Sequence, residues 1–177
     1  REKVLLADKM PIWLAKDEEQ MKNIFYKQLE RLDVDCIDMY LVHNVSVPGW
    51  KRCKKLNLMP FLEEMQAQGK IKHIGFSFHD KLEFFKEMID EYDWKFCQIQ
   101  LNYLDWSLQD AERKYVILSE RGMPVWVMEP VHGGVLVDLP EAQAEMLRAA
   151  HPDESIASWG FRWLQGLENV HMVLSGM

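Results

Sequence analysis

Short apolar runs alternate with amphipathic stretches along the whole chain, and this alternation constrains the fold more than any other feature. The apolar runs are residues 4–7, 37–42, 73–76, 96–99, 125–128 and 171–174. Most are rich in β-branched or aromatic residues and are too short for helices, so they are predicted to be strands. Their near-continuous apolarity is typical of parallel strands that are covered on both faces.

The stretches between these runs have helical periodicity. Asp17 and Gln20 have the spacing of a capping box, and apolar residues follow them at intervals of three and four. Asp80 and Glu83 repeat this spacing ahead of a second apolar stripe. Further helices are predicted around residues 61–65 with Gly69 as a left-handed C-terminal cap, from Ser107 to Gly122, and from Glu154 to Gln165.

Repetition of strand, helix and strand predicts right-handed βαβ units and a parallel sheet, which is an α/β fold. The chain contains no Ser/Gly-rich linker and no low-complexity segment, so residues 1–177 are predicted to form a single domain. The longest irregular stretches are expected at residues 44–56 and 130–140. Both follow strands, and α/β proteins place their binding sites beyond the carboxyl ends of their strands.

Composition excludes several classes of protein. With 21 Lys and Arg against 28 Asp and Glu, the net charge of −7 argues against a general nucleic-acid binder. No apolar run reaches the roughly 18–20 residues that span a bilayer, and the first residues do not resemble a secretory signal. The cysteines Cys36, Cys53 and Cys97 form no C-x-x-C pair, so neither a disulfide framework nor a metal site is predicted. A cytoplasmic location without membrane contact is expected.

Polar side chains follow the predicted strands. Lys9 ends the first strand, His43 and Asn44 the second, and Ser77 the third. The later strands carry Gln98, Gln100 and Asn102, then Glu129, then Ser175. Each case alone is ordinary, because polar residues are common at strand ends. Together they predict a site for a polar, anionic ligand, since the carboxyl ends of parallel strands meet at one rim.

Six segments in order carry a resemblance to a known family: VLLADKMP, IDMYLVHNV, GKIKHIGFSFHD, FCQIQLNYLD, VWVMEPVHGG and VLSGM. Together they resemble the aldo/keto reductases, over essentially all 177 residues. The most similar branch is the bacterial and archaeal one, whose full-length members often carry an iron–sulfur tail. The resemblance implies a parallel (β/α)8 TIM barrel. That barrel usually takes about 250 residues and eight strands, so this chain is expected to form an incomplete barrel of about six strands.

The resemblance also implies an activity and its residues. Aldo/keto reductases transfer hydride between NADP(H) and a carbonyl or alcohol substrate, using an Asp, Tyr, Lys and His tetrad. Lys9 and His43 match the tetrad lysine and histidine. Further residues match the cofactor-binding positions of the family. Ser77 and Gln98 would hold the nicotinamide carboxamide, and Glu129 lies where many relatives stack an aromatic ring. Gly133 and Gly134 suit close approach of a pyrophosphate.

The chain departs from the family pattern in several places. The tetrad Asp and Tyr precede the segment at which this sequence starts, so the chain is expected to lack the first two βα units as well as the C-terminal end. For want of those two groups it is predicted to be inactive alone. Asp8 replaces the usual Thr, and Phe78 replaces an Asn that contacts the carboxamide. No cysteine-rich tail is present, so no iron–sulfur cluster is assigned.

Other functions stay open at this stage. The first and sixth strands would be open edges, which suits a non-catalytic binding or assembly module and self-association. Lys9 could also serve an enzyme that uses a Schiff base. Metal-dependent chemistry is disfavoured because the histidines lack ligand spacing. The substrate is not identified; Trp13, Trp50 and Trp106 are candidate pocket walls, and His79, His132 and His151 are assigned no role.

Overall fold

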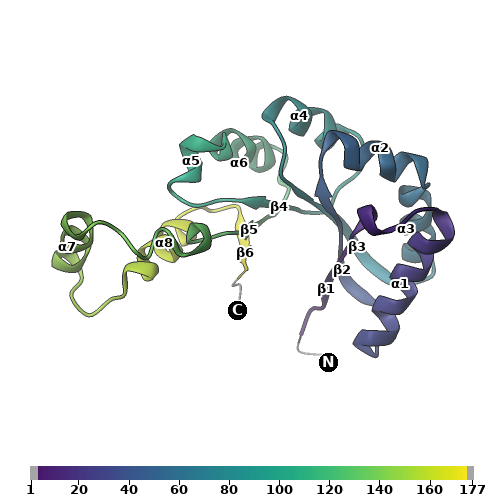
Figure 1. Ribbon diagram of the computed structural model, residues 1–177, viewed down its shortest axis with the longest axis horizontal. Coiled ribbons are helices and arrows are strands. Elements are labelled where there is room, and N and C mark those ends of the chain that lie inside the picture. The colour runs from purple at the N-terminus through teal and green to yellow at the C-terminus, as the bar shows by residue number, and fades with distance from the viewer. Residues whose placement is uncertain (1–3, 175–177) are drawn as a thin grey trace. The chain divides into compact units, whose positions relative to one another are not determined.

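The computed structural model describes residues 4–174 (Figure 1). It has an α/β fold in which six strands alternate with helices, as the sequence predicts. The chain divides into two compact units, residues 1–97 and 98–177. The single-domain organisation of the chain stays a prediction. Ser175, expected at the end of the sixth strand, lies outside the described residues.

The first unit contains three strands that are adjacent in chain order. The pairing of β1 with β2 and of β2 with β3 is parallel. Its elements are β1 (Ala7–Met10), the 3-10 turn η1 (Ile12–Leu14), α1 (Glu18–Leu32), β2 (Ile37–Val45), α2 (Val47–Lys55), α3 (Leu58–Ala67), β3 (Ile71–Phe78) and α4 (Leu82–Asp90).

The core of the first unit lies between its strands and the helices α1 and α3, which lie side by side (Figure 1). Phe25 of α1 contacts Tyr40 of β2 and Phe61 of α3, with ring centroids 5.2 and 5.5 Å apart. All three rings are buried. Tyr40 therefore faces the helices, and its hydroxyl donates a hydrogen bond of 2.6 Å to Gln28 Oε1 of α1.

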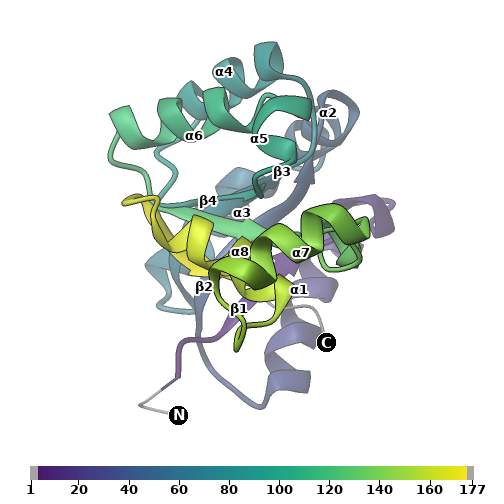
Figure 2. The same cartoon turned by 90° about the vertical axis from the view of Figure 1, so that its left-hand side faces the viewer.

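The second unit contains the strands β4, β5 and β6, which are also adjacent in chain order. β5 and β6 pair in parallel, and α7 lies beside α8 (Figure 2). The elements are β4 (Cys97–Gln100), which starts at the last residue of the first unit, α5 (Asp105–Leu108), α6 (Ala111–Glu120), β5 (Val125–Met128), the 3-10 turn η2 (His132–Gly134), α7 (Glu141–Ala150), α8 (Ile156–Gln165) and β6 (Val170–Val173).

The six predicted strands are present, with altered ends. β5 has the predicted bounds, whereas β2 and β3 extend further than their apolar runs. The strand start that differs most from the prediction is that of β1, which begins at Ala7 and not at Val4. Val4 and Leu5 are exposed, because pairing with β2 includes only the following residues. Lys9 consequently lies inside a strand.

Two predicted helix signals are confirmed. Asp17 is the N-cap of α1, and its carboxylate accepts a hydrogen bond of 2.8 Å from Gln20 N. Gly69 has a φ of +73° and lies just after α3. Its N–H donates to Gln66 O, and Lys70 N donates to Met65 O, which closes the end of the helix.

Two other predicted helix starts are wrong. Asp80 does not cap α4, whose N-cap residue is Lys81. Instead one oxygen of Asp80 accepts from Lys81 N and the other from Val47 N, so the carboxylate connects the starts of α4 and α2. Ser107 lies within the short helix α5, and α6 begins after Asp110, which is in the left-handed region.

The prediction of an irregular segment at residues 44–56 is also wrong, because α2 occupies most of it. Ser46 caps this helix by accepting from Gly49 N, and Pro48 lies in its first turn, where its missing N–H costs nothing. α7 was not predicted. Cys53 and Cys97 are buried and Cys36 is half-buried.

Candidate functional site

Lys9 and His43 lie on neighbouring strands of the first unit. In the parallel pairing of β1 with β2, Lys9 is opposite Leu41, and His43 follows two residues further along β2. Alternate residues of a strand point to the same face. Since Tyr40 points toward α1, Lys9, Leu41 and His43 share the opposite face. Both polar side chains are half-buried.

The positive charge of Lys9 affects the pKa of His43. Burial lowers the pKa of the Lys9 amine, and the neighbouring Asp8 carboxylate partly offsets this effect. Burial, together with smaller contributions from the positive charges of Lys9 and His79, lowers the pKa of His43 to about 4. His43 is therefore a neutral imidazole near pH 7. A neutral ring has one N–H donor and one acceptor nitrogen.

An aromatic wall stands beside His43. Its ring contacts the ring of Trp13, with centroids 4.8 Å apart. The turn η1, which carries Trp13, is held by Arg52 of α2, whose Nε lies 3.1 Å from both Ile12 O and Ala15 O. A cavity of about 340 Å³ opens there. Its lining consists of Ile12, Trp13, Asn44, Ser46, Pro48, Gly49 and Arg52.

Ser77 supports the end of β2. It is fully buried in β3, and its Oγ accepts a hydrogen bond of 2.8 Å from Asn44 N. Asn44 has a φ of +53°, at an irregularity in the pairing of β2 with β3 between Val42 and Val45. The hydroxyl of Ser77 thus keeps its proton for a second partner.

Asp8 lies on the other face of β1 from Lys9. It is opposite Tyr40 in the pairing of the two strands, and its charge adds to the burial that raises the pKa of that phenol. Its Oδ1 accepts from Lys9 N at 2.7 Å. Burial nevertheless raises the pKa of Asp8. The sequence alone gave no account of this acid, and its partner is a main-chain N–H.

The remaining predicted site residues lie in the second unit. Gln98 is buried in β4, and its Nε2 lies 3.1 Å from Met128 Sδ. Its Oε1 has no hydrogen-bond partner among the residues that the structure describes. Glu129 is exposed, directly after β5, with a φ of +57°. Gly133 and Gly134 have φ values of +61° and +95°, so the backbone itself favours glycine at both positions.

A polar cluster that the sequence did not identify lies beside them. His132 Nδ1 is 2.8 Å from Oδ2 of the buried Asp105, at the start of α5. The available signal was the position of His132 directly before the glycine pair. No regular spacing connects it to Asp105, 27 residues earlier in the sequence.

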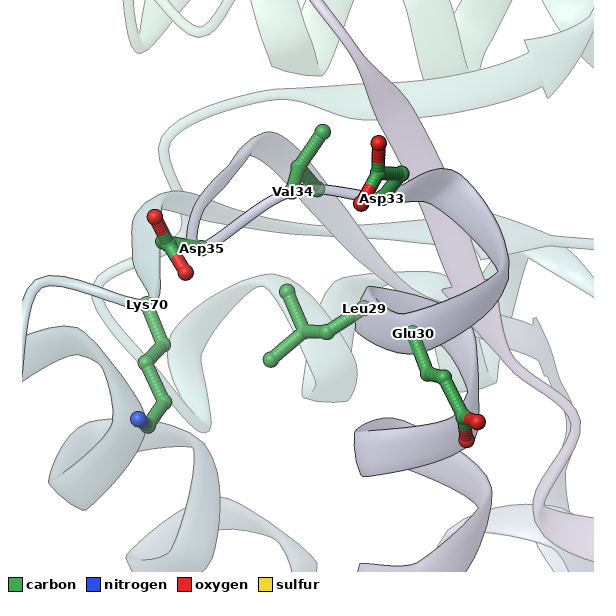
Figure 3. A pocket seen from close by; sticks show the side chains of 6 residues that line it. All are labelled: Leu29, Glu30, Asp33, Val34, Asp35 and Lys70. Carbon is green, nitrogen blue, oxygen red and sulfur yellow. The ribbon is translucent and has the colours of Figure 1, made fainter.

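The other cavities and tryptophans lie elsewhere. A polar pocket of about 370 Å³ is found at the amino-end side of the first unit's strands (Figure 3). Asp33 and Asp35 reach it from the α1–β2 connection and Lys70 from the segment before β3 (Figure 3). Trp50 packs in the core against Trp94, and Trp106 packs against Trp163, so neither belongs to the cavity beside His43.

Two features are absent from the described residues 4–174. No helix in this range has the length and apolarity needed to cross a membrane. Within the same range, no group of three or more His, Cys, Asp and Glu side chains is arranged to hold a metal ion.

Comparison with known proteins adds a family to this geometry. The sequence profile of the Aldo/keto reductase family matches residues 1–176. Curated protein sequences gave no significant match. An aldo-keto reductase from Bacillus halodurans, in its holo form, has a similar structure, with a TM-score of 0.77 and 22% sequence identity over 100% of this chain.

Two further solved structures are similar. The thermostable aldo-keto reductase Tm1743, bound to the inhibitor epalrestat, has a TM-score of 0.75 at 21% identity over 100% of this chain and 63% of its own. An aldo-keto reductase from Klebsiella pneumoniae in complex with NADPH has a TM-score of 0.73 at 19% identity over 99% of this chain and 61% of its own. These likenesses show the fold. The chain spans 62% of the length of the Bacillus halodurans protein.

Proposed function

This chain belongs to the aldo/keto reductase family, and we propose that the protein transfers hydride between NADP(H) and a carbonyl or alcohol substrate. The observation that carries the proposal is the electrostatic contact between Lys9 and His43 on one face of two neighbouring strands. Reduction of a carbonyl places negative charge on its oxygen. An ammonium group and a neutral N–H donor stabilise such a charge and guide a proton to it.

The residues around His43 suggest separate roles. His43, neutral near pH 7, would orient the substrate carbonyl by a hydrogen bond, and Lys9 would stabilise charge on oxygen or on a neighbouring phenol. The cavity beside Trp13 would hold the rest of the substrate. An aromatic wall that contacts the His43 ring suits a substrate with an apolar or planar group next to its carbonyl.

The nicotinamide, when bound, supplies or accepts the hydride. Ser77 retains a hydroxyl proton, and the buried Oε1 of Gln98 is an acceptor without a partner among the described residues. Each side chain by itself is therefore suited to a carboxamide group, Ser77 as a donor and Gln98 as an acceptor. We assign further cofactor contacts to Glu129, Gly133 and Gly134. NADP(H) is proposed in preference to NAD(H), and the relative from Klebsiella pneumoniae was solved with NADPH.

The family branch and the cellular location of the protein are also part of the proposal. Membership of the branch with an iron–sulfur tail and a cytoplasmic location are proposed on the sequence resemblance.

The test uses the complete protein and its intrinsic fluorescence, to which the seven tryptophans contribute. Titration with NADPH is expected to quench this fluorescence, and aldehydes are expected to oxidise the bound cofactor. Lys9→Met should reduce the turnover rate by at least about a hundredfold while leaving NADPH affinity within a fewfold. Lys27→Met, on the exposed side of α1, is the matched control and should behave as wild type.

Two results would contradict the proposal. The first is the absence of fluorescence change at millimolar NADPH in the complete protein. The second is trapping of a carbonyl substrate on Lys9 by borohydride, which would assign Schiff-base chemistry to this amine in place of hydride transfer.

A further inference from the structure

The cavity beside Trp13 has a positive charge on its wall. Of the seven described residues that line it, Arg52 is the one with an ionisable side chain, and neither Asp nor Glu is among them. A guanidinium group stays protonated throughout the pH range in which proteins are folded, so this charge is permanent. The cavity therefore suits a ligand that carries a negative charge.

The half-buried guanidinium of Arg52 is held in place by two of its three nitrogens. Nε lies 3.1 Å from both Ile12 O and Ala15 O, and Nη2 also donates to Ala15 O. The third nitrogen, Nη1, donates to no residue in the described range 4–174. Its two hydrogens are therefore available to another acceptor while the rest of the group keeps its orientation.

The charge of Arg52 is not neutralised by a neighbouring acid. No carboxylate in the described part of the chain forms an ion pair with it. The acid that contacts the start of α2 is Asp80, and its two oxygens accept from Val47 N and Lys81 N. Ser46, which also lines the cavity, accepts from Gly49 N and keeps its hydroxyl proton as a second donor.

Trp13 connects this cavity with His43. Its ring contacts the His43 ring, with centroids 4.8 Å apart, and it lines the cavity together with Arg52. A molecule that places its carbonyl at His43 and extends along the Trp13 ring therefore brings its far end to the Arg52 side. The volume of about 340 Å³ is at the small end of the range for ligand pockets, so a single ring with one charged group is of suitable size.

We propose that Arg52 determines substrate specificity by binding a carboxylate at the end of the substrate away from the reacting carbonyl. The inference rests on the proposed function and names a substrate class for the same site, small oxo acids with a planar or apolar group between carbonyl and carboxylate. The bond from Nη1 to a carboxylate is charge-assisted and about twice as strong as a neutral one. Because the carboxylate takes no part in the reaction, this contact lowers KM and leaves kcat nearly unchanged.

The experiment uses the complete protein, NADPH and two aldehydes that differ in charge. These are para-formylbenzoate, which carries a carboxylate, and its methyl ester, which has the same ring and aldehyde without the charge. The quantity compared is the ratio of kcat/KM for the acid to kcat/KM for the ester. The intrinsic reactivity of the two aldehydes is the same for every variant, so a change in this ratio reports on the protein. For wild type the ratio should fall as salt is added, because ions screen the guanidinium.

Arg52→Gln is expected to lower this ratio about tenfold, through a higher KM for the acid. Arg52→Lys keeps the charge and should keep most of the preference. Lys51→Gln is the matched control, because it removes the same charge from the preceding, exposed residue of α2, which does not line the cavity. A role of Arg52 confined to holding η1 would impair both aldehydes equally, so an unchanged ratio in Arg52→Gln would overturn the inference.

Failure of the inference can be told apart from failure of the proposed function. If both aldehydes are reduced and the ratio is the same in Arg52→Gln as in wild type, the inference fails and the proposed function stands. If neither aldehyde is reduced, the proposed function fails, and calorimetric binding of para-formylbenzoate decides the inference. Weaker binding by Arg52→Gln than by Lys51→Gln would support the carboxylate site, whereas equal or absent binding would overturn it.

Discussion

At the residue scale, the imidazole of His43 links the candidate site to folding stability. Its pKa is about 4 in the folded chain, below the ordinary value of 6.5, so the unfolded chain takes up a proton first as pH falls. Stability contributed by this group is present above pH 6.5 and is lost as pH decreases toward 4. Partial exposure of the ring reduces the size of the effect.

The expected outcome is a steeper loss of unfolding free energy between pH 7 and pH 5 in wild type than in His43→Gln, because Gln cannot take up a proton. Urea denaturation at a series of pH values measures this difference. Equal slopes for the two proteins would show that burial and the charge of Lys9 do not depress protonation of the ring. His171→Gln, at an exposed position, provides a control with the same change of side chain.

Gly75 of β3 provides a second residue-scale prediction. A Cβ at this position would lie 2.6 Å from Cε1 of Phe96, whose ring is buried and has little room to move. Gly75→Ala is expected to lower the free energy of unfolding by about 1–3 kcal/mol through overpacking. Adding Phe96→Leu to Gly75→Ala should cost less than the sum of the two single changes, as measured by a double-mutant cycle in urea. Additive costs would contradict a direct clash.

Some residues of the candidate site could be proposed from the sequence and others could not, for reasons visible at this scale. Lys9, His43 and Ser77 could be predicted because each lies at or near the end of an apolar strand, and position along a strand determines the rim it reaches. Asp105 and His132 could not, because their contact joins the first residues of α5 and η2 without any repeating interval. The unpaired Oε1 of Gln98 likewise depends on neighbours that the sequence does not specify.

At the scale of elements, helix α1 has a cap whose removal can be measured. The Asp17 side chain accepts from Gln20 N at 2.8 Å, and Glu18 and Glu19 follow in the first turn. Asp17→Ala is expected to destabilise the chain by about 1 kcal/mol, and Asp17→Asn by much less, since the amide oxygen can still accept. Thermal or urea unfolding of both variants tests this. Equal costs would point to loss of charge near the helix start as the cause.

The sequence analysis did not predict helices α2 and α7. α2 begins with Val47, Pro48 and Gly49, residues that are typical of loops, yet Ser46 caps it and Trp50 and Cys53 bury its inner face. α7 has only Ala144 buried, so it lacks the broad apolar stripe that marked α1. In α2, tertiary contacts outweigh the local signal.

At the scale of the whole molecule, the order of strands and helices was the most predictable property. Parallel strands joined by helices leave few permitted topologies, so the alternation alone indicated the α/β class. The division into two compact units was not predicted, because it depends on how densely each half packs and not on a change of composition at residue 97.

The last prediction concerns association of the 177-residue chain. In the described part of the chain, β1 pairs with β2 and with no other strand, so its outer edge offers main-chain groups to a second copy. Both main-chain groups of Lys9 are already satisfied, because Gln28 Nε2 donates to Lys9 O at 2.8 Å and Lys9 N donates to Asp8 Oδ1 at 2.7 Å, and weak association is therefore expected. Light scattering after size exclusion should give a mass that rises with concentration, and Ala7→Lys, at an exposed position of β1, should suppress the rise. Leu14→Lys adds the same charge at an exposed site outside the strand and should leave the rise in mass unchanged. A constant monomer mass for the unmodified chain would show that the edge of β1 does not bind a second copy.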